Sequence, residues 1–409
     1  MKVKQFLVGF NIFLIILGFI YEPSISIFTN MVPLIMGSDT LITDYFIKGS
    51  VGSAFLNAGL VGLIAIYLLN RYVTEDTIRA FPAVMLMTGF AFFGKNILNI
   101  WPIIIGTYIY SKHKKISFGS VLPTAFFATS FAPLISELLF ASSGNLVVRI
   151  LLSWALGISV GFIIVFFSNH MFRIHKGYNL YNVGFSIGIL STLYVSLLRS
   201  FGLDIQTHLM WDDTMHISMF MVFYFLFIGL IVYGVLSDNT SLQKYRKLLK
   251  TTGHQARYID EFGFETVSIN MGVNGIVSLS YLLLIGAPLN GATLGGVLTV
   301  VGFASNGKHL FNIVPIFIGI LLGSITKTWS INLPSMVLGA LFGTGLAPLV
   351  GRFGLIPGIV ASYVMSSVVL NTGFLHGGLN LYNTGFAIGL VCAFLVPLYE
   401  AIFTDEDSI

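Results

Sequence analysis

The sequence predicts an all-α integral membrane protein whose chain contains two related halves of opposite orientation in the membrane. Three observations predict this class: a composition that is 56% hydrophobic and 9% charged over 409 residues, a long series of apolar stretches, and motifs that recur in both halves. Soluble domains carry about 25% charged residues. Apolar stretches of roughly 15 to 24 residues are near the length that crosses a hydrocarbon core of about 30 Å.

The apolar stretches are predicted to be helices, because the alternating polarity over about ten residues that is typical of membrane β-barrels is absent. The first stretch follows Lys2 and Lys4, and its length favours a retained signal anchor over a cleaved signal peptide. A shorter apolar stretch, 25–37, is expected to lie at the membrane interface or to fold back. The predicted membrane helices cover residues 5–21, 47–70, 78–93, 97–111, 118–140, 146–168, 178–198, 215–236, 263–286, 291–305, 310–326, 333–350, 355–374 and 379–402.

Two motifs relate the halves. GKNILNIWPIIIG at 94–106 and GKHLFNIVPIFIG at 307–319 share the glycine, the lysine, the second asparagine, the proline and the closing glycine at identical spacing. HKGYNLYNVGF at 175–185 and HGGLNLYNTGF at 376–386 share a longer signature. Because the matches follow the same order in both halves, they predict an internal duplication.

The basic residues predict how the halves are oriented. The cluster at 112–115 and the polar linker 237–262 are placed in the cytoplasm, since basic loops are retained there. The helix at 47–70 then enters the membrane from outside, whereas its counterpart at 263–286 leaves from inside. The two repeats are therefore predicted to be antiparallel.

This orientation places the N-terminus in the cytoplasm and gives each repeat about six membrane elements. The helix at 5–21 is then a peripheral addition, and 215–236 is the crossing that inverts the second copy. The predicted domains are an N-terminal signal anchor with an external segment (1–43), the first repeat (44–200), a connecting transmembrane helix with a basic cytoplasmic linker (201–262), the second, inverted repeat (263–403) and an acidic tail (404–409).

Lys95 and Lys308 stand in the repeated motif between short apolar runs. Either each pair of runs, 78–111 and 291–326, forms a re-entrant hairpin, or the runs are thin crossings; the sequence leaves both open. A lysine at bilayer depth costs several kcal/mol and needs a partner or a task. Two lysines beside a shared cavity would favour an anionic ligand, although each could instead cap helix carbonyls or extend to lipid headgroups.

Six asparagines are predicted to line the solute site together with the lysines. Two of them each stand one helical turn after a lysine and share its helix face. The other four belong to the Asn-Leu-Tyr-Asn signature, where a spacing of three puts both amides on one face. Buried amides need partners, so these bind either solute or a neighbouring helix. The six residues are Asn99, Asn312, Asn179, Asn182, Asn380 and Asn383.

Three ionisable residues are candidates for coupling transport to protons or ions. His175 and His376 precede the asparagine signature at matched distances, and histidine titrates near neutral pH. A helix cap or an interface role is the alternative for both. Glu137 has the basic Arg352 at the corresponding place in the second copy, so this acid breaks the symmetry of the repeats.

Other classes of site are excluded by composition and motifs. Cys392 is the only cysteine, so the chain has no internal disulfide and no paired-cysteine metal site. The HExxH, GxSxG and GxxxxGK[ST] motifs are absent, which predicts that the protein is not an enzyme and uses no cofactor or metal. The basic residues fall in short loops rather than in a patch with interleaved aromatic residues, so nucleic acid is not an expected partner.

The GKxxxNIxP and HxGxNLYNxGF motifs resemble those of a family of uncharacterised bacterial multi-pass membrane proteins, and the resemblance spans nearly the whole chain. It implies the membrane class and supplies no substrate. The stretches Gly177-Tyr178-Asn179 and Gly378-Leu379-Asn380 are also similar to glycine-aromatic-asparagine stretches of urea transporters, which are inverted repeats. The rest of the urea transporter pattern is missing, so this likeness is an analogy.

The function that we expect is transport of a small polar or anionic solute through a site between the repeats near the membrane midplane. The expected partners are this solute, the lipid bilayer and further copies of the chain in a homo-oligomer, and the expected location is the inner or plasma membrane. One alternative is a channel-like facilitator of a neutral solute, in which the lysines are structural. Another is a membrane scaffold or sensor that transports nothing.

Overall fold

The computed structural model describes residues 2–73, 80–141, 144–203, 205 and 207–403. Within these residues the secondary structure is helical, apart from an isolated bridge between Thr43 and Met210. The acidic tail predicted at 404–409 lies outside the described residues. The expected all-α membrane class is confirmed at this level, because nine of the described helices are long and apolar enough to cross a membrane.

The first half of the chain contains ten α-helices, a 3-10 turn and a π-helical turn. A bend of 47° separates the segments Phe118–Phe131 and Pro133–Ala141, which give a tenth span if they cross the membrane together. The elements are α1 (Lys2–Tyr21), α2 (Ser26–Met36), α3 (Tyr45–Lys48), α4 (Val51–Tyr72), α5 (Phe81–Phe90), α6 (Trp101–His113), α7 (Phe118–Ala128), η1 (Thr129–Phe131), α8 (Pro133–Ser136), η2 (Glu137–Ala141), α9 (Leu146–His175) and α10 (Asn182–Ser200).

The second half begins with α11 and repeats the alternation of long and short helices. Its elements are α11 (Ile217–Ser237), α12 (Ser241–Leu248), α13 (Tyr258–Phe262), α14 (Phe264–Leu284), α15 (Gly291–Phe303), α16 (Leu310–Thr326), α17 (Pro334–Gly343), η3 (Thr344–Leu346), α18 (Ala347–Phe353), α19 (Leu355–Leu375) and α20 (Asn383–Phe403).

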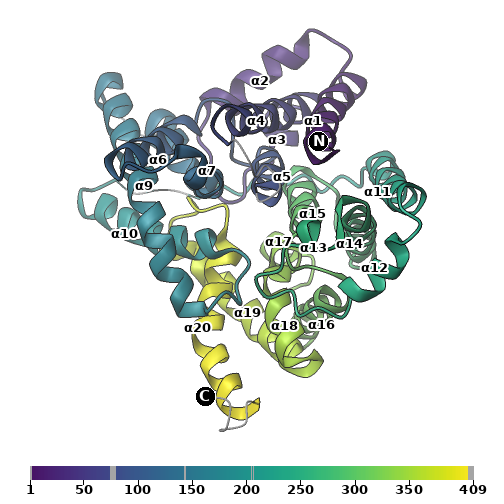
Figure 1. Cartoon of the computed structure of the whole chain (residues 1–409). Coiled ribbons are helices and arrows are strands. Elements are labelled where there is room, and N and C mark those ends of the chain that lie inside the picture. Colours follow the sequence, from purple (N-terminus) through teal and green to yellow (C-terminus); the bar gives the residue numbers. More distant parts are fainter. Residues whose placement is uncertain (1, 74–79, 142–143, 204, 206, 404–409) are drawn as a thin grey trace.

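Helices pack in the same pairs in both halves. In the first half α1 packs against α4 and α6 against α9; in the second half α11 packs against α14 and α16 against α19. Two further pairs join the halves, α5 with α15 and α10 with α20, and Figure 1 shows α20 lying beside α10. Each of these two contacts is therefore formed by one helix of the first half and one helix of the second half.

Glycines allow the two short helices α5 and α15 to approach closely. A Cβ atom at Gly89 would lie 2.8 Å from the carbonyl oxygen of Gly295, and a Cβ atom at Gly295 would lie 2.4 Å from the carbonyl oxygen of Gly89. Small residues at such crossings let backbones meet where side chains would hold them apart. The centre of the molecule is consequently built on backbone contact between the halves.

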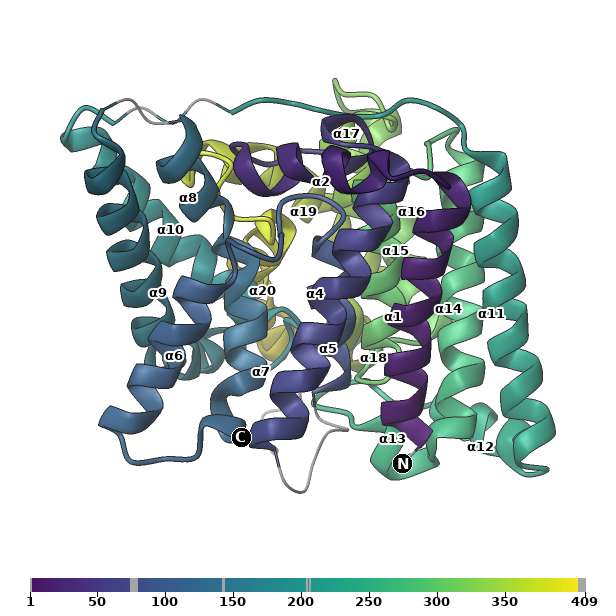
Figure 2. The ribbon, with the colours of Figure 1, turned by 90° about the horizontal axis from the view of Figure 1, so that it is seen from above.

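The long helices run roughly side by side, with both chain termini at the same edge and α2 lying across the opposite edge (Figure 2). The outward faces of these helices carry large apolar side chains, such as Phe166, Phe225 and Phe394, which are 66%, 74% and 71% exposed. Water would not cover such faces favourably, whereas lipid would. The fold is thus that of a membrane protein with many membrane-spanning helices.

Candidate functional site

Two loops carry the lysines of the repeated motif. The first lysine loop, residues 91–100, joins α5 to α6, and the second lysine loop, residues 304–309, joins α15 to α16. Each turns at a glycine with positive φ, Gly94 at 123° and Gly307 at 103°. Residues with a side chain rarely adopt this backbone conformation, so the glycine of the motif is required for the turn.

An asparagine from a neighbouring helix holds each lysine loop. Asn57 on α4 donates from Nδ2 to the carbonyl oxygens of Ala91 and Lys95, at 2.7 and 2.8 Å. A buried carbonyl left without a donor would cost about 1–3 kcal/mol. The second loop has the same two bonds, from Asn270 on α14 to Ala304 and Lys308, at 2.8 and 2.7 Å.

Asn99 and Asn312, which were predicted to line the solute site, bind loop backbone. Nδ2 of Asn99 donates to the carbonyl of Gly94 at 3.0 Å, and its Oδ1 accepts from the N–H of Asn96 at 2.9 Å. Asn312 makes the matching bonds, to the carbonyl of Gly307 and from the N–H of His309, both at 2.8 Å. Both side chains are buried, and in this structure they fasten the lysine loops.

Lys308 is completely buried and has two hydroxyl partners. Its Nζ donates to Oη of Tyr181 at 2.5 Å and to Oγ1 of Thr344 at 2.8 Å. The hydroxyl of Thr344 in turn donates to the carbonyl of Leu341 at 2.6 Å. The ammonium group of Lys308 thus connects Thr344 of the second half with Tyr181 of the first half through short hydrogen bonds.

Lys95 is equally buried and has poorer partners. Its Nζ lies 3.3 Å from the carbonyl oxygen of Phe126 and 3.7 Å from the sulfur of Met87. The carbonyl of Phe126 already accepts from the hydroxyl of Thr129 at 2.7 Å, and a thioether is a weak acceptor. The two lysines therefore share a backbone setting and differ in what their ammonium groups contact.

A continuous group of aromatic rings lies between the two lysines. Nζ of Lys308 is 4.9 Å from the ring centroid of Tyr181, and the rings of Tyr181 and Tyr382 are 4.7 Å apart. Tyr382 contacts Phe90 edge-on at 4.8 Å, and Nζ of Lys95 is 4.9 Å from the Phe90 centroid. Tyr181 and Tyr382 come from the two copies of the asparagine signature, so the signatures meet each other at the interface between the halves.

The remaining polar residues of the signature form two nearly identical networks. Nε2 of His175 donates to Oδ1 of Asn182 at 2.9 Å, while Nδ1 accepts from the N–H of Asn179 at 3.4 Å. A ring that both donates and accepts is neutral. The second copy has His376 with Asn383 at 2.9 Å and with Asn380 at 3.3 Å.

One side-chain bond of the signature has no counterpart. Nδ2 of Asn179 donates to the carbonyl of Gly385 at 3.0 Å. The matching Nδ2 of Asn380 is buried and has no hydrogen-bond partner in the part of the chain that the structure describes. The second asparagine of each copy binds the preceding helix, Asn182 to the carbonyl of Ser168 and Asn383 to that of Val369, both at 3.0 Å.

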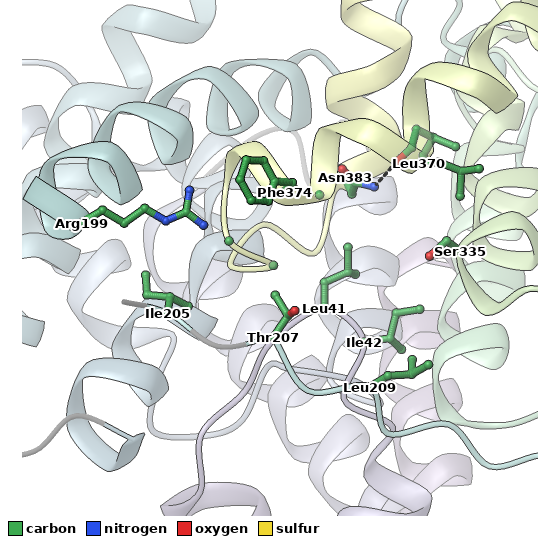
Figure 3. Close-up of a pocket in the computed structure, with 14 residues that line it drawn as sticks. Leu41, Ile42, Arg199, Ile205, Thr207, Leu209, Ser335, Leu370, Phe374 and Asn383 are labelled. Atoms are coloured by element: carbon green, nitrogen blue, oxygen red, sulfur yellow. Dashed lines mark hydrogen bonds between the residues drawn. The ribbon is translucent and has the colours of Figure 1, made fainter. Parts of the chain in front are cut away.

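Two cavities reach the signature from different sides of it. The larger, about 530 Å³, lies beside the end of α19 and includes Arg199, Phe374 and Asn383 in its wall (Figure 3). The guanidinium of Arg199 lies 5.0 Å from the ring centroid of Phe374. The smaller, about 240 Å³, lies beside the end of α9 and is lined by Tyr181, Asn182 and Tyr382, among others.

The model of a protein family described as a protein of unknown function (DUF1576) matches residues 24–200 and 237–401. These two regions cover most of the chain. The chain belongs to the DUF1576 family. The match confirms the resemblance to an uncharacterised family. No curated protein and no solved structure matches the sequence.

Glu137, the acid that was expected to break the symmetry of the repeats, is buried in this member of the DUF1576 family. It begins the π-helical turn after α8, and its electrostatic neighbours are Asp39 and Lys48. Asp39 and Lys48 form a buried ion pair at 2.6 Å. The corresponding Arg352 lies on α18 and interacts with Tyr178, so the two residues occupy unrelated surroundings.

The site contains residues that sequence reasoning missed. Tyr181 and Tyr382 are not among the predicted site residues, although each lies inside the repeated signature, between its two asparagines. Thr344 is not among them either, although TSFAPL at 129–134 and TGLAPL at 344–349 place a threonine at the same position in both halves. Within the described ranges, no group of three or more histidine, cysteine, aspartate or glutamate side chains is arranged to hold a metal ion.

Proposed function

We propose that this protein is a membrane transporter for a small anionic solute, built from two inverted repeats with the solute site between them. Inversion places equivalent residues around an axis in the membrane plane, where transporters of this architecture hold their substrates. Each step of the proposal is supported by a separate feature of the chain.

The count of crossings supports the inversion. The nine long helices and the bent pair together give ten spans, and an even number agrees with both termini lying at one edge (Figure 2). In this count the short helices α5 with α6 and α15 with α16 are re-entrant hairpins, each entering and leaving at one face. Their tips are the lysine loops, whose irregular backbone is covered by protein, as membrane depth requires.

The helix pairs extend each proposed repeat by one element. Because α1 packs against α4 as α11 packs against α14, we assign α1 to the first repeat and α11 to the second. This assignment replaces the expectation that 5–21 is a peripheral addition and 215–236 only a connecting crossing. Each repeat then contains one more membrane helix than the six elements expected from the sequence.

Basic residues support a cytoplasmic location for both termini. Lys112, Lys114 and Lys115 follow the end of α6, and α12 carries Lys244 and Lys247. Figure 2 draws α12 and the end of α6 at the edge that holds the termini. Basic loops are retained in the cytoplasm, so we place this edge there.

The observation that carries the choice of an anionic solute is the pair of buried lysines. Lys95 and Lys308 are both completely buried, and neither belongs to the ion pairs formed among the described residues. A buried charge without an opposite charge is costly, and lysines inside membrane proteins mark substrate pathways or counter-ions. An anionic solute would supply the missing charge.

The two cavities support alternating access to such a site. One lies beside the end of α19 and the other beside the end of α9. These are matched helices of the two repeats, and inversion would turn their ends to opposite faces of the membrane. Tyr181 and Tyr382 line the smaller cavity and not the larger, and we interpret this arrangement as a closed state.

The test is flux into proteoliposomes that contain the purified full-length protein. We expect uptake of one or more small organic or inorganic anions, and we expect loss of at least about 90% of that uptake when Lys95 and Lys308 are both replaced by methionine. Lys114→Met, at an exposed position of the basic loop, is the control and should keep the wild-type rate.

The rival functions give different results in the same assay. A facilitator of neutral solutes would carry such solutes and keep its flux in the double lysine variant. A scaffold or sensor would give no flux with any solute. Either result would contradict the proposed anion transporter.

A further inference from the structure

The surroundings of Lys95 contain polar groups that lack hydrogen-bond partners. The hydroxyls of Tyr382 and Ser130 are buried, and neither has a partner among the residues that the structure describes. Buried hydroxyls are normally paired, and leaving one unpaired costs about 1–3 kcal/mol. Lys95 itself has only the long contacts to a carbonyl and a thioether. Three donors in one neighbourhood thus lack a good acceptor.

Two neighbouring residues, Phe90 and Leu381, link these three residues. The ring of Phe90 touches both the ammonium group of Lys95 and the ring of Tyr382. Leu381, which precedes Tyr382, donates its N–H to the carbonyl of Ser130 at 3.0 Å. The side chain of Leu381 also lies against the first lysine loop, since a Cβ atom at Gly94 would be 2.7 Å from its Cδ2.

The matching cluster in the other half has direct hydrogen bonds between its side chains. Leu180 donates its N–H to the carbonyl of Gly345 at 3.1 Å, as Leu381 does to Ser130. Here Tyr181 bonds Lys308 directly, and Thr344 supplies the second oxygen. Lys308 thus has two hydroxyl partners of the protein at hydrogen-bonding distance, which Lys95 lacks.

A serine stands in the first half where the second half has a glycine. Gly345 lies against the ring of Tyr181, where a Cβ atom would be 2.6 Å from Cδ2 and Cε2. The ring of Tyr181 can therefore pack directly against this backbone, and its hydroxyl reaches Nζ of Lys308. We infer that the side chain of Ser130, at the corresponding place, keeps the ring of Tyr382 from packing in the same way.

We propose that Lys95, Tyr382 and Ser130 bind one small monovalent anion, and that Lys308 stands outside this site as a structural counterpart. An anion would accept hydrogen bonds from the ammonium group and both hydroxyls, and its single negative charge would balance the positive charge of Lys95. This inference rests on the proposed transport function and assigns its substrate class and the half of the protein that holds it.

Binding of chloride, nitrate, formate and acetate to the purified full-length protein tests the inference, with each sodium salt titrated by calorimetry at constant ionic strength. At least one anion should bind saturably. Lys95→Met and Tyr382→Phe should each weaken binding by about tenfold or more, as expected when a hydrogen bond to a charged group is lost. Lys308→Met should bind within about threefold of wild type.

Matched controls separate binding from folding. Tyr281→Phe removes another buried hydroxyl that has no partner among the described residues, and it should leave anion affinity unchanged. Tyr382→Phe keeps the ring, so its loss of affinity must occur with a wild-type elution profile and melting temperature. If Tyr382→Phe binds as wild type does, the inference is overturned.

Two further outcomes would also overturn it. One is the absence of binding by all four anions; the other is loss of binding in Lys308→Met with retention in Lys95→Met. Parallel flux measurements distinguish these from failure of the proposed function. Anion flux that depends on Lys308 alone would contradict the assignment of the site and would leave the proposed transport function intact. Binding without any flux would contradict the transport function and would leave the assignment of the site intact.

Discussion

The two lysine loops have the same backbone support and different ammonium environments. In each loop a glycine with positive φ makes the turn, and an asparagine from a neighbouring helix binds two loop carbonyls. Lys308 is then satisfied by two hydroxyls of the protein, whereas Lys95 is not. The shared sequence motif therefore predicts the shared backbone structure of the two loops. The difference between the two ammonium environments indicates where a ligand would bind.

The largest effect is expected from removing the shared support. Asn57→Ala leaves two buried carbonyls without their asparagine donor, and Asn270→Ala removes the matching two bonds, although Nδ2 of Asn274 still donates to the carbonyl of Lys308 at 3.4 Å. Each variant should lower the free energy of unfolding by about 2–5 kcal/mol. The melting temperature in detergent measures this loss. Asn371→Ala, which removes an exposed amide bonded within its own helix, is the control. A large loss in one half only would break the equivalence of the two scaffolds.

The next effect concerns a support at the start of α15. Oδ1 of Asp44 accepts from the N–H of Gly291 at 3.1 Å, at the start of α15. Burial raises the pKa of Asp44 to about 7 from the ordinary 3.8, although backbone N–H groups favour its ionised form. A raised pKa means that the folded state prefers the neutral acid. Its contribution to stability is full below pH 4 and is lost as the pH rises through 7.

Asp44→Asn cannot ionise and lacks this dependence. Between pH 5 and pH 8 the wild type should lose about 1–3 kcal/mol of stability relative to Asp44→Asn. Melting temperatures of both proteins across this range measure the change. A constant difference between the two curves would show that Asp44 keeps one protonation state and that its bond to the start of α15 does not depend on pH.

The packing of the Tyr181 ring against Gly345 predicts the clearest steric difference between positions 345 and 130. Gly345→Ala places a methyl group against the tyrosine ring, so it should cost about 1–3 kcal/mol of stability through overpacking. Ser130→Ala removes a hydroxyl that has no partner among the described residues and should change stability by less than about 0.5 kcal/mol. Gly373→Ala is the matched control, because nothing lies within 4 Å of a Cβ atom there. Equal losses at 130 and 345 would remove the proposed cause of the asymmetry.

The smallest effect comes from single hydroxyls. Tyr181→Phe takes one of two partners from Lys308 and should cost about 1–2 kcal/mol. Tyr382→Phe removes a hydroxyl without a partner in the described structure and should be neutral or slightly stabilising in the absence of anions. The free energies of unfolding of both variants, measured in a buffer of bulky anions such as gluconate, check this prediction. A larger loss for Tyr382→Phe than for Tyr181→Phe would contradict the difference between the two lysine environments.

The membrane class, the lysine loops and the paired histidines and asparagines could be predicted from the sequence, because each rests on local composition or on a string that recurs. The glycine turns at 94 and 307 follow from the motif alone. The contact between Tyr181 and Tyr382 could not be predicted, since it joins two distant copies of one signature through tertiary packing. The pairing of α1 with α4 was missed for a related reason: α1 carries no repeated motif.

The asparagines show a second limit of the sequence. Asn99 and Asn312 are predicted to line the solute site together with the lysines, and in this structure their buried amides bind the loop backbone. A sequence indicates that a buried amide needs a partner and does not tell which partner it has. The same limit applied to Lys95 and Lys308, whose motifs match and whose partners differ.

The most direct test of the account is the location of a heavy anion in crystals of the protein grown in bromide. Anomalous diffraction identifies bromide independently of the protein atoms. We expect a peak within hydrogen-bonding distance of Nζ of Lys95 and Oη of Tyr382, and no peak beside Lys308. A peak beside Lys308 with none at Lys95 would contradict the account.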